Sequence, residues 1–349
     1  MSATGGWRMP PEWAPHRRTW MAWPSSGYTL GETEEDADTA RGTWASVARA
    51  VAQFEPVTVV ADPSAVDVAQ AWLTRGGGPP HRVDVVEASL DDAWMRDIGP
   101  TFVLDGQGRL GAVDWVFNGW GAQEWATWDD DALVGCQVAD WAGATRLGSD
   151  LVNEGGGIHV DGLGTVLLTE TVQLDPGRNP GLTRADVEAE LARTIGATRC
   201  IWLPRGLTRD YGEFGTRGHV DIVATFAAPG IVLLHWQSDP AHPDHEVSLE
   251  LERLLSSARD ARGEPLEVVR VPAPLTLEDG EGWVDWSYIN HLVCNGGVVA
   301  CTFEDARDAP SLAILEGAYP GRRVVGVDAR PLFDRGGGIH CITQQQPAV

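Results

Sequence analysis

The sequence contains no lysine. Its 349 residues include 26 positively charged side chains, all of them arginine, against 50 aspartates and glutamates, so the formal net charge is −24. Without lysine the chain forms no Schiff base with a carbonyl substrate or with pyridoxal phosphate, and it builds no P-loop. The acidic balance argues against nucleic acid and an anionic membrane as partners. It is compatible with a cationic substrate, although an acidic solvated surface alone would produce the same sum.

Cysteine is scarce as well. The five cysteines form no CxxC pair and are odd in number, at positions 136, 200, 294, 301 and 341. We therefore expect no disulfide framework and predict a reduced, cytoplasmic protein. No apolar run reaches the roughly 18 residues of a membrane span. The first residues lack a basic start followed by an apolar core, so we expect no secretion signal.

Motifs of metal and serine hydrolases are also absent, because the chain has neither HExxH nor GxSxG. His242, Asp244, His245 and Glu246 are spaced like metal ligands, but neighbouring prolines place them where a chain enters a helix. We interpret this segment as a solvated loop and predict no dedicated metal site. A metal at the central cluster described below remains an alternative, since soft and hard ligands occur there together.

Turn signals recur between paired apolar runs, which predicts four β-hairpins. The predicted strand pairs are Thr101–Leu104 with Leu110–Val116, Ile158–Val160 with Thr165–Thr169, Val220–Phe226 with Ile231–Trp236, and Tyr288–Val293 with Val298–Phe303. A helical stripe of apolar residues follows each hairpin, and one precedes them all. The stripes are Trp44/Val47/Val51, Val134/Val138/Trp141, Val187/Leu191/Ile195, Val247/Leu251/Leu254 and Leu312/Leu315/Tyr319. Thr183, with Asp186 three residues later, predicts a capping box at the start of the third of these helices.

A short strand follows most of these helices. The expected strands are Val57–Ala61, Arg199–Leu203, Glu267–Val271 and Arg323–Val327, with Thr145–Leu147 less clearly marked. A strand–strand–helix–strand unit thus recurs roughly every 55 to 70 residues, a period that favours units arranged around an axis.

The two ends of the chain supply the strands that are left over. Pairing Arg18–Trp23 with Ile339–Gln344 would complete a fifth unit and close a ring without exposed edges. We therefore predict one cyclic α/β domain over residues 1–349. An open doubly wound sheet is the alternative, but hairpins between helices do not suit a purely parallel sheet.

Polar signatures stand next to these units, where equivalent ends would point toward one axis. They are Trp94–Asp97, Asn153–His159, Gly218–Asp221 and Gly336–Cys341. Gathered at the axis would be the thiol of Cys341, the imidazole of His219 with His159 or His340, and the carboxylates of Asp97, Glu154 and Asp221. On a strand, His219 and Asp221 would share one face.

This combination points to chemistry on a guanidino group. A thiolate is a nucleophile, an imidazole carries protons near neutral pH, and clustered carboxylates need a cation between them. Guanidinium is the planar cation that two carboxylates hold in fork geometry. Attack by Cys341 on its central carbon, with His219 protonating ammonia, would give a covalent thiouronium adduct that water then releases as a ureido product.

Each residue also has a simpler interpretation. A buried cysteine is often a small core residue, and Gly218–Asp221 could be an inward strand with a satisfied histidine. Arg96 and Asp97 could form a structural ion pair, and Glu154 could be a turn carboxylate. Their shared place in the repeat favours the site.

These segments resemble the agmatine deiminase group of guanidine-modifying enzymes, which is related to bacterial peptidyl-arginine deiminases. The resemblance covers nearly the whole chain, through Met9–Trp13, Trp20–Pro24, Trp94–Asp97, Val116–Gly121, Glu154–Gly162, Asn179–Pro180, Gly218–Asp221 and Gly336–Pro347. It implies a pentein fold, a five-fold pseudosymmetric α/β propeller of repeated ββαβ units. It also implies that no cofactor is needed.

The resemblance assigns roles to individual residues. Cys341 would be the nucleophile and His219 the acid and base, Asp97 and Asp221 would bind the guanidinium, Glu154 would complete the polar shell, and Trp94 would line the pocket. The predicted function is hydrolysis of agmatine to N-carbamoylputrescine and ammonia, in polyamine biosynthesis toward putrescine. The partner is then a small cationic guanidino substrate, and a homo-oligomer is compatible with this.

The chain departs from the group pattern at three places. Ile222 and Gly338 stand where the group usually has asparagine, and Arg217 falls in a stretch that tends toward Asp/Glu-Thr-Asn-Gly. On a strand, Arg217 would share the face of His219, repel the ammonium of agmatine and suit a carboxylated substrate. Alternatively, it points away or pairs with Glu213. Peptidyl-arginine deimination, amidine transfer and non-catalytic guanidine binding therefore stay open as other functions.

Overall fold

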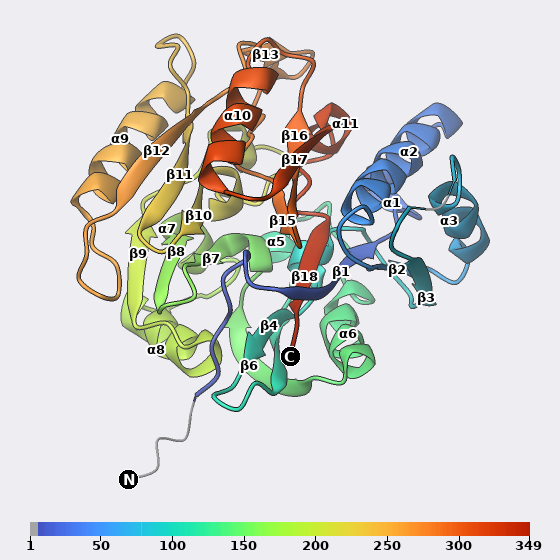
Figure 1. Cartoon of the computed structure of the whole chain (residues 1–349), viewed down its shortest axis with the longest axis horizontal. Helices are drawn as coiled ribbons and strands as arrows, with labels where there is room; N and C mark the ends of the chain where they lie inside the picture. Colours follow the sequence, from blue (N-terminus) through green and yellow to red (C-terminus); the bar gives the residue numbers. More distant parts are fainter. Residues whose placement is uncertain (1–5, 78) are drawn as a thin grey trace.

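The strands of the computed structural model, which describes residues 6–77 and 79–349, lie in six sheets. Figure 1 labels most of them. They are β1 His16–Ala22, β2 Val57–Ala61, β3 Val83–Glu87, β4 Thr101–Leu104, β5 Leu110–Val116, β6 Thr145–Val152, β7 Ile158–Val160, β8 Thr165–Thr169, β9 Arg199–Leu203, β10 Ala224–Ala228, β11 Ile231–Trp236, β12 Glu267–Pro272, β13 Glu278–Asp279, β14 Gly282–Trp283, β15 Leu292–Cys294, β16 Gly297–Thr302, β17 Arg323–Asp328 and β18 Thr343–Pro347.

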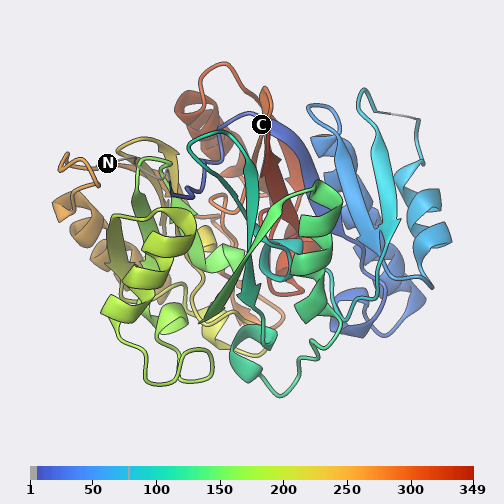
Figure 2. The same cartoon turned by 90° about the horizontal axis from the view of Figure 1, so that it is seen from below.

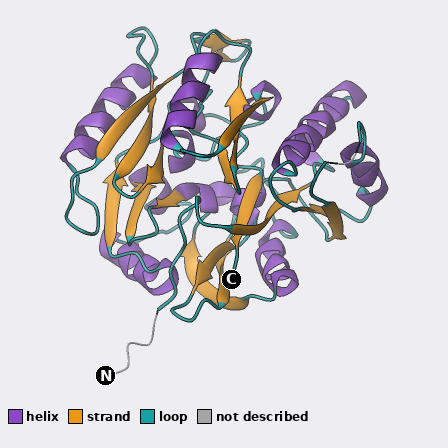
Figure 3. Ribbon diagram, viewed as in Figure 1, coloured by secondary structure: helices purple, strands orange, loops and turns teal. Residues whose placement is uncertain are grey.

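The helices lie mainly on the outside of these sheets, as Figure 3 shows in purple. They are α1 Gly27–Leu30, α2 Glu34–Val51, α3 Val66–Leu73, α4 Met95–Ile98, α5 Gly119–Ala122, α6 Val134–Ala142, α7 Glu170–Gln173, α8 Arg184–Ile195, α9 Asp244–Ser257, α10 Asp308–Ala318 and α11 Arg330–Phe333. Within the described ranges, no helix combines the length and the apolar character needed to cross a membrane.

Four sheets repeat one plan, an antiparallel hairpin followed across a helix by a parallel third strand. They are β4-β5-β6, β7-β8-β9, β10-β11-β12 and β15-β16-β17. All four predicted hairpins are confirmed, and so is the mixed α/β class.

The fifth sheet joins the two ends of the chain. Strand β18 pairs antiparallel with β1, with Thr19 opposite Gln345, and β1 then pairs in parallel with β2. Figure 2 shows the dark red C-terminal strand beside the dark blue first strand. The predicted pairing of the two ends is therefore confirmed. Strand β3, which extends this sheet, was not predicted.

Three strands begin four residues later than predicted, and two of these errors lie at the polar signatures Gly218–Asp221 and Gly336–Cys341. Residues Val220–Ile222 form a 3₁₀ turn before β10, and β15 and β18 begin at Leu292 and Thr343, later than predicted. These segments are buried, so their apolar character matches that of a strand although the backbone turns inward. Periodicity alone does not separate the two cases.

The helical stripes largely face the core. Trp44, Val47 and Val51 of α2 are fully buried, as are Val187 and Leu191 of α8. Burying such side chains provides most of the stability of an amphipathic helix. One prediction is wrong: Trp141, assigned to the buried stripe of α6, is 43% exposed, although its ring stacks on Trp20.

The predicted capping box is present at the start of α8. The Thr183 hydroxyl accepts the N–H of Asp186, whose carboxylate accepts the N–H of Thr183. Replacing Thr183 with Ala should lower the free energy of unfolding by about 1 kcal/mol, because the amide of Asp186 loses its acceptor and the Asp186 carboxylate loses the hydroxyl that donates to it. Urea denaturation measures this change. The Thr183→Ser control keeps the hydroxyl and should stay near wild type; equal losses in both variants would contradict the capping role.

Candidate active site

The predicted site residues lie on loops and short turns that precede the hairpins. Asp97 belongs to α4, Glu154 precedes the turn Gly155–Gly157, and Cys341 lies two residues before β18. His219 and Asp221 flank the start of the 3₁₀ turn Val220–Ile222. All five side chains are buried, none more than 5% exposed. The structure thus brings a thiol, an imidazole and three carboxylates together.

His219 is held through both its ring and its backbone. Its Nε2 atom lies 3.1 Å from a Glu154 oxygen, and its Nδ1 atom lies 3.9 Å from Asp97 and has no hydrogen-bond partner in the described chain. The carboxylate of Asp210 accepts the backbone N–H groups of Gly218 and His219. Burial disfavours the imidazolium, but the carboxylates of Asp97 and Glu154 outweigh it and raise the pKa of His219 to about 9.

Glu154 stays ionised although it is completely buried. Burial opposes its charge, but the guanidinium of Arg178 and the bond to His219 overcome this and lower the pKa of Glu154 to about 2. The Nε atom of Arg178 lies 3.0 Å from each carboxylate oxygen. A charge-assisted contact of this kind is among the strong hydrogen bonds in proteins.

Among the described residues, Asp97 has only neutral hydrogen-bond donors. The indole N–H of Trp120 donates to one carboxylate oxygen at 2.9 Å, and the backbone N–H of Gly156 donates to the other at 3.2 Å. Burial raises the pKa of Asp97 to about 6, with Glu154 and Asp221 acting in the same direction and His219 against it. Its charge is therefore the least stabilised of the three carboxylates.

Asp221 is paired with His340 in a buried chain of polar groups. One oxygen of Asp221 lies 2.7 Å from Nδ1 of His340, whose Nε2 lies 2.7 Å from Glu12. Burial opposes its charge, but His340 lowers the pKa of Asp221. Its second oxygen has no hydrogen-bond partner among the described residues. An ionised carboxylate therefore keeps one free acceptor.

The thiol of Cys341 lies between Asp221 and Asn290. The Asn290 amide donates to Sγ at 3.2 Å, and Sγ lies 3.6 Å from Asp221. Burial, together with the charges of Asp221 and Asp97, holds the pKa of this thiol well above its ordinary value. A cation placed against these carboxylates would remove that electrostatic cost and favour the thiolate.

The backbone of Gly156 comes close to three of these groups. A Cβ at this position would lie 2.5 Å from Nδ1 of His219, 3.0 Å from Asp97 and 3.1 Å from Asp221. Any side chain here would displace the polar groups that gather around it. The glycine thus allows the backbone to approach them closely enough for its N–H to donate to Asp97.

A narrow pocket with about 240 Å³ of empty space leads to this cluster. It is lined by Cys341, Asp97, Thr216, Gly336 and five aromatic residues, Tyr28, Trp94, Trp120, Trp125 and Phe214. In its wall, Tyr28 stacks on Phe214 with centroids 4.3 Å apart, and Trp125 stacks on Trp120 at 5.3 Å. Trp94 lies in the pocket wall, as the resemblance implied.

Arg217 is not among these lining residues. Its side chain is 39% exposed and pairs with Asp175 at 3.2 Å, not with Glu213. The prediction that it shares a strand face with His219 and Asp221 is wrong, because no strand forms there. The backbone of Arg217 is left-handed, with φ 68°, as the loop turns toward Gly218.

The second histidine cluster is also corrected. His242 and Asp244 are buried, not solvated: His242 lies 3.1 Å from a backbone carbonyl, and Asp244 accepts the hydroxyl of Thr208 at the start of α9. Over the described ranges, the structure has no group of three or more His, Cys, Asp or Glu side chains that could hold a metal ion.

Four residues close to the cluster escaped the sequence reasoning as functional candidates. They are Arg178, Asn290, Trp120 and Glu12. Trp120 and Glu12 lie within segments quoted for the resemblance, and Arg178 directly precedes another, so position in these motifs was the available signal. Asn290 carried no signal, since a lone asparagine in an apolar run is common.

Comparisons with known proteins extend over the whole fold. A family model for the Porphyromonas-type peptidyl-arginine deiminases matches residues 8–347. A candidate agmatine deiminase of Streptomyces coelicolor is 61% identical over 341 residues, or 97% of this chain and 98% of that protein. The agmatine deiminase of Ectopseudomonas mendocina is 40% identical over 365 residues, or 98% and 96% of the two chains.

A solved structure supports the same relationship. The agmatine deiminase of Enterococcus faecalis has a TM-score of 0.89 and 32% identity to this chain, and the match covers 99% of this chain and 98% of that one. Taken with the family model over residues 8–347, these matches mean that the chain belongs to the Porphyromonas-type peptidyl-arginine deiminase family.

Proposed function

We propose that this protein is a hydrolase that converts agmatine to N-carbamoylputrescine and ammonia through a covalent cysteine intermediate. The observation that carries the proposal is the buried cluster of the Cys341 thiol, His219 and three carboxylates, two members of which, Cys341 and Asp97, line one pocket. The relatives named agmatine deiminase, which align over nearly the whole chain, support the choice of substrate.

The guanidinium would bind between Asp97 and Asp221. Asp221 has a free oxygen, and each oxygen of Asp97 uses one of its two lone pairs. A planar guanidinium matches two carboxylates in fork geometry. Trp94, in the pocket wall, would lie beside this plane.

Substrate binding would activate the nucleophile. Asp221 and Asp97 disfavour a thiolate at Cys341, and a guanidinium between them neutralises this effect. The pKa of the thiol then falls only when the substrate is in place. In the empty pocket the thiol stays protonated, which protects it from oxidation and alkylation.

The reaction would follow in two halves. The thiolate of Cys341 attacks the guanidinium carbon and forms a C–S bond, His219 donates its proton to the departing nitrogen, and the C–N bond breaks to release ammonia. In the second half, neutral His219 takes a proton from water, the resulting hydroxide attacks the thiouronium carbon, and the C–S bond breaks as the new hydroxyl releases its proton to solvent. The ureido product leaves, and the thiolate is restored.

The pocket wall supports a substrate with a cationic tail. Among the described residues that line it none is an arginine, and five of the nine are aromatic, with ring faces that attract cations. Arg217, which would favour a carboxylated substrate, is paired with Asp175 instead. We therefore prefer agmatine over peptidyl-arginine and assign Arg217 no role in substrate binding.

The architecture and cellular location are proposed on the same basis. The four sheets that share the hairpin plan, with a fifth in which β18 and β1 form the antiparallel pair, support five pseudosymmetric units of a propeller, closed where β18 meets β1. All five cysteines are free, which supports the reducing environment of the cytoplasm.

The choice of substrate predicts a ranking. Agmatine should give a higher kcat/KM than free arginine, guanidinobutyrate or an arginine-containing peptide, because a carboxylate or peptide carbonyl finds no cation in the pocket wall. Assays of ureido product and ammonia on the four compounds test this. A preference for the peptide would reverse the assignment, and silence on all four would favour a guanidine-binding protein.

The role of Cys341 predicts a separation of turnover from binding. The Cys341→Ser variant should lose at least about 100-fold in kcat while agmatine affinity changes little, because the weaker nucleophile leaves the carboxylates in place. Isothermal titration measures the affinity, and Cys136→Ser, on the outer helix α6, is the matched control. Substantial turnover by Cys341→Ser would refute the covalent mechanism.

The raised pKa of Asp97 predicts how binding depends on pH. Below about pH 6 Asp97 takes up a proton and loses the charge that pairs with guanidinium, so affinity should fall about tenfold for each pH unit. Titrating agmatine into Cys341→Ser between pH 4.5 and 8 avoids interference from the thiol. With Asp97→Asn added, agmatine affinity should be weak and should not change with pH over this range. If the pH dependence stayed the same, Asp97 would not be the group that binds the guanidinium.

A further inference from the structure

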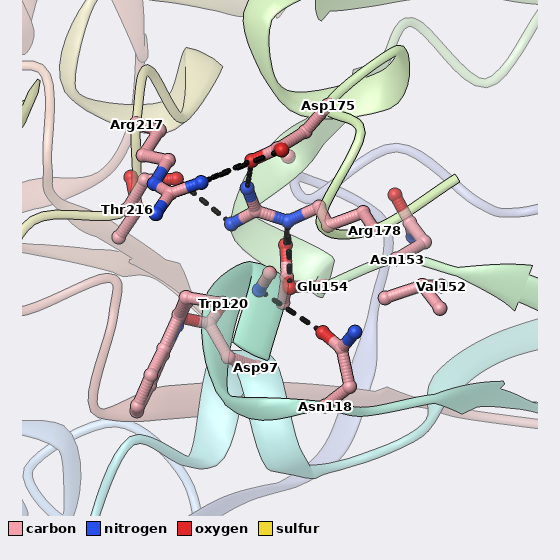
Figure 4. Close-up of polar contacts among 12 residues, drawn as sticks. Asp97, Asn118, Trp120, Val152, Asn153, Glu154, Asp175, Arg178, Thr216 and Arg217 are labelled. Carbon is pink, nitrogen blue, oxygen red and sulfur yellow. Dashed lines mark hydrogen bonds and ion pairs between the residues drawn. The ribbon is translucent and has the colours of Figure 1, made fainter. Parts of the chain in front are cut away.

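Arg178 stands behind the pocket with its whole guanidinium buried. Its side chain has no exposed surface, and it does not line the pocket. Nε contacts both oxygens of Glu154 at 3.0 Å, Nη1 donates to Asp175 at 2.9 Å, and Nη2 donates to the backbone carbonyl of Thr216 at 2.8 Å. Figure 4 shows these contacts converging from three segments of the chain. A buried charge with this many partners keeps its position, because moving it would break several contacts at once.

Two of these contacts help to hold His219, one through its side chain and the other through its backbone. Glu154 is the hydrogen-bond partner of the imidazole, and Thr216 begins the loop that leads to His219. The hydroxyl of Thr216 also accepts the backbone N–H of His219 at 3.1 Å. One guanidinium therefore holds both the side-chain partner of His219 and the loop that carries it.

The segment around Arg178 also reaches the loop that supports Asp97. The side chain of Asn118 donates to the carbonyl of Gly177 at 2.9 Å and accepts the N–H of Gly121 at 3.0 Å. Between them, Trp120 donates to Asp97. This loop is strained, because Trp120 has a left-handed backbone with φ 55°, and such a conformation needs support from its surroundings.

We propose that Arg178 is the positioning residue of the active site, which keeps Glu154 charged and in contact with His219 through both halves of the reaction. This proposal rests on the proposed function in one respect, because the kcat measurement uses agmatine as the substrate. His219 gives up a proton in the first half and takes one from water in the second. Glu154 has to orient the ring in both states without taking the proton itself, and the adjacent guanidinium ensures this.

Arg217 provides a matched control within the same cluster. Its guanidinium contacts the same Asp175 from the other side, and its side chain is 39% exposed. Within the described chain, this guanidinium donates no hydrogen bond to Glu154 or to the carbonyl of Thr216. Removing either arginine deletes one positive charge near Asp175. Only removal of Arg178 separates Glu154 from its cation.

The first test is the pH dependence of kcat for agmatine. In Arg178→Met, kcat should fall about 100-fold, and a new acidic limb should appear because Glu154 takes up protons where the wild-type residue stays ionised. The profile of kcat reports the substrate complex, whereas protonation of Asp97 in the free enzyme affects kcat/KM. KM should therefore change less than kcat.

Two further variants separate positioning from folding. Arg178→Lys keeps the charge without the fork, and it should recover part of kcat and move the acidic limb back toward wild type. Arg217→Met should keep kcat within about threefold of wild type and leave the profile unchanged. If Arg178→Met does not fold, comparing the kcat and the pH profile of Arg178→Lys with those of Arg217→Met still tests the proposal. A folded Arg178 variant with wild-type kcat and profile would overturn the proposal, as would equal defects in Arg178→Met and Arg217→Met.

A measurement without substrate keeps this proposal separate from the proposed function. In ¹³C NMR of the side-chain carboxyls, Glu154 should not titrate above pH 4 in the wild type and should titrate in that range in the Arg178 variants. If the wild type does not turn over agmatine, the proposed function fails while this titration still tests Arg178. An unchanged Glu154 signal would overturn the positioning role whatever the substrate is.

Discussion

Mutual repulsion between Asp97, Glu154 and Asp221 is the constraint around which the centre of this molecule is built. Three carboxylates buried within one site favour protonation unless each has a compensating partner. The three carboxylates have different partners, and the stability of the negative charge differs accordingly. Glu154 has a guanidinium, Asp221 has an imidazole, and Asp97 has only an indole and a backbone amide. Asp97 is thus the residue whose charge depends most on a cation brought in by a ligand.

The same constraint explains why the residues around the cluster are polar and buried. Arg178 on one side and His340 on the other each lie against an acid, and each has a second acid behind it, Asp175 and Glu12. Buried charges persist in alternating chains of this kind, because removing one member leaves its neighbour uncompensated. The centre of the molecule is an ionic network, and the apolar cores lie between the sheets and the outer helices.

The fold brings these groups together because the strands begin only after them. The candidate site residues occupy turns that precede strands, where the backbone is free of ladder hydrogen bonds and turns inward. Pairing of the two ends of the chain contributes as well. Cys341 lies two residues before β18, the strand that pairs with β1, so the position of the thiol depends on contacts between the two ends of the chain.

The sequence by itself determined the elements and the chemical inventory. Local patterns produced the hairpins, the helices and the capping box at Thr183, because turn residues, apolar periodicity and caps act over a few residues. The recurrence of polar signatures was enough to gather Cys341, His219 and the three acids into one group. Only the tertiary structure decided their partners. It places Arg178 behind Glu154, Asn290 beside the thiol, and Arg217 on Asp175 instead of in the pocket. Such pairings join residues from different units, and the energy of a buried charge depends on the groups around it in space, which no local pattern encodes.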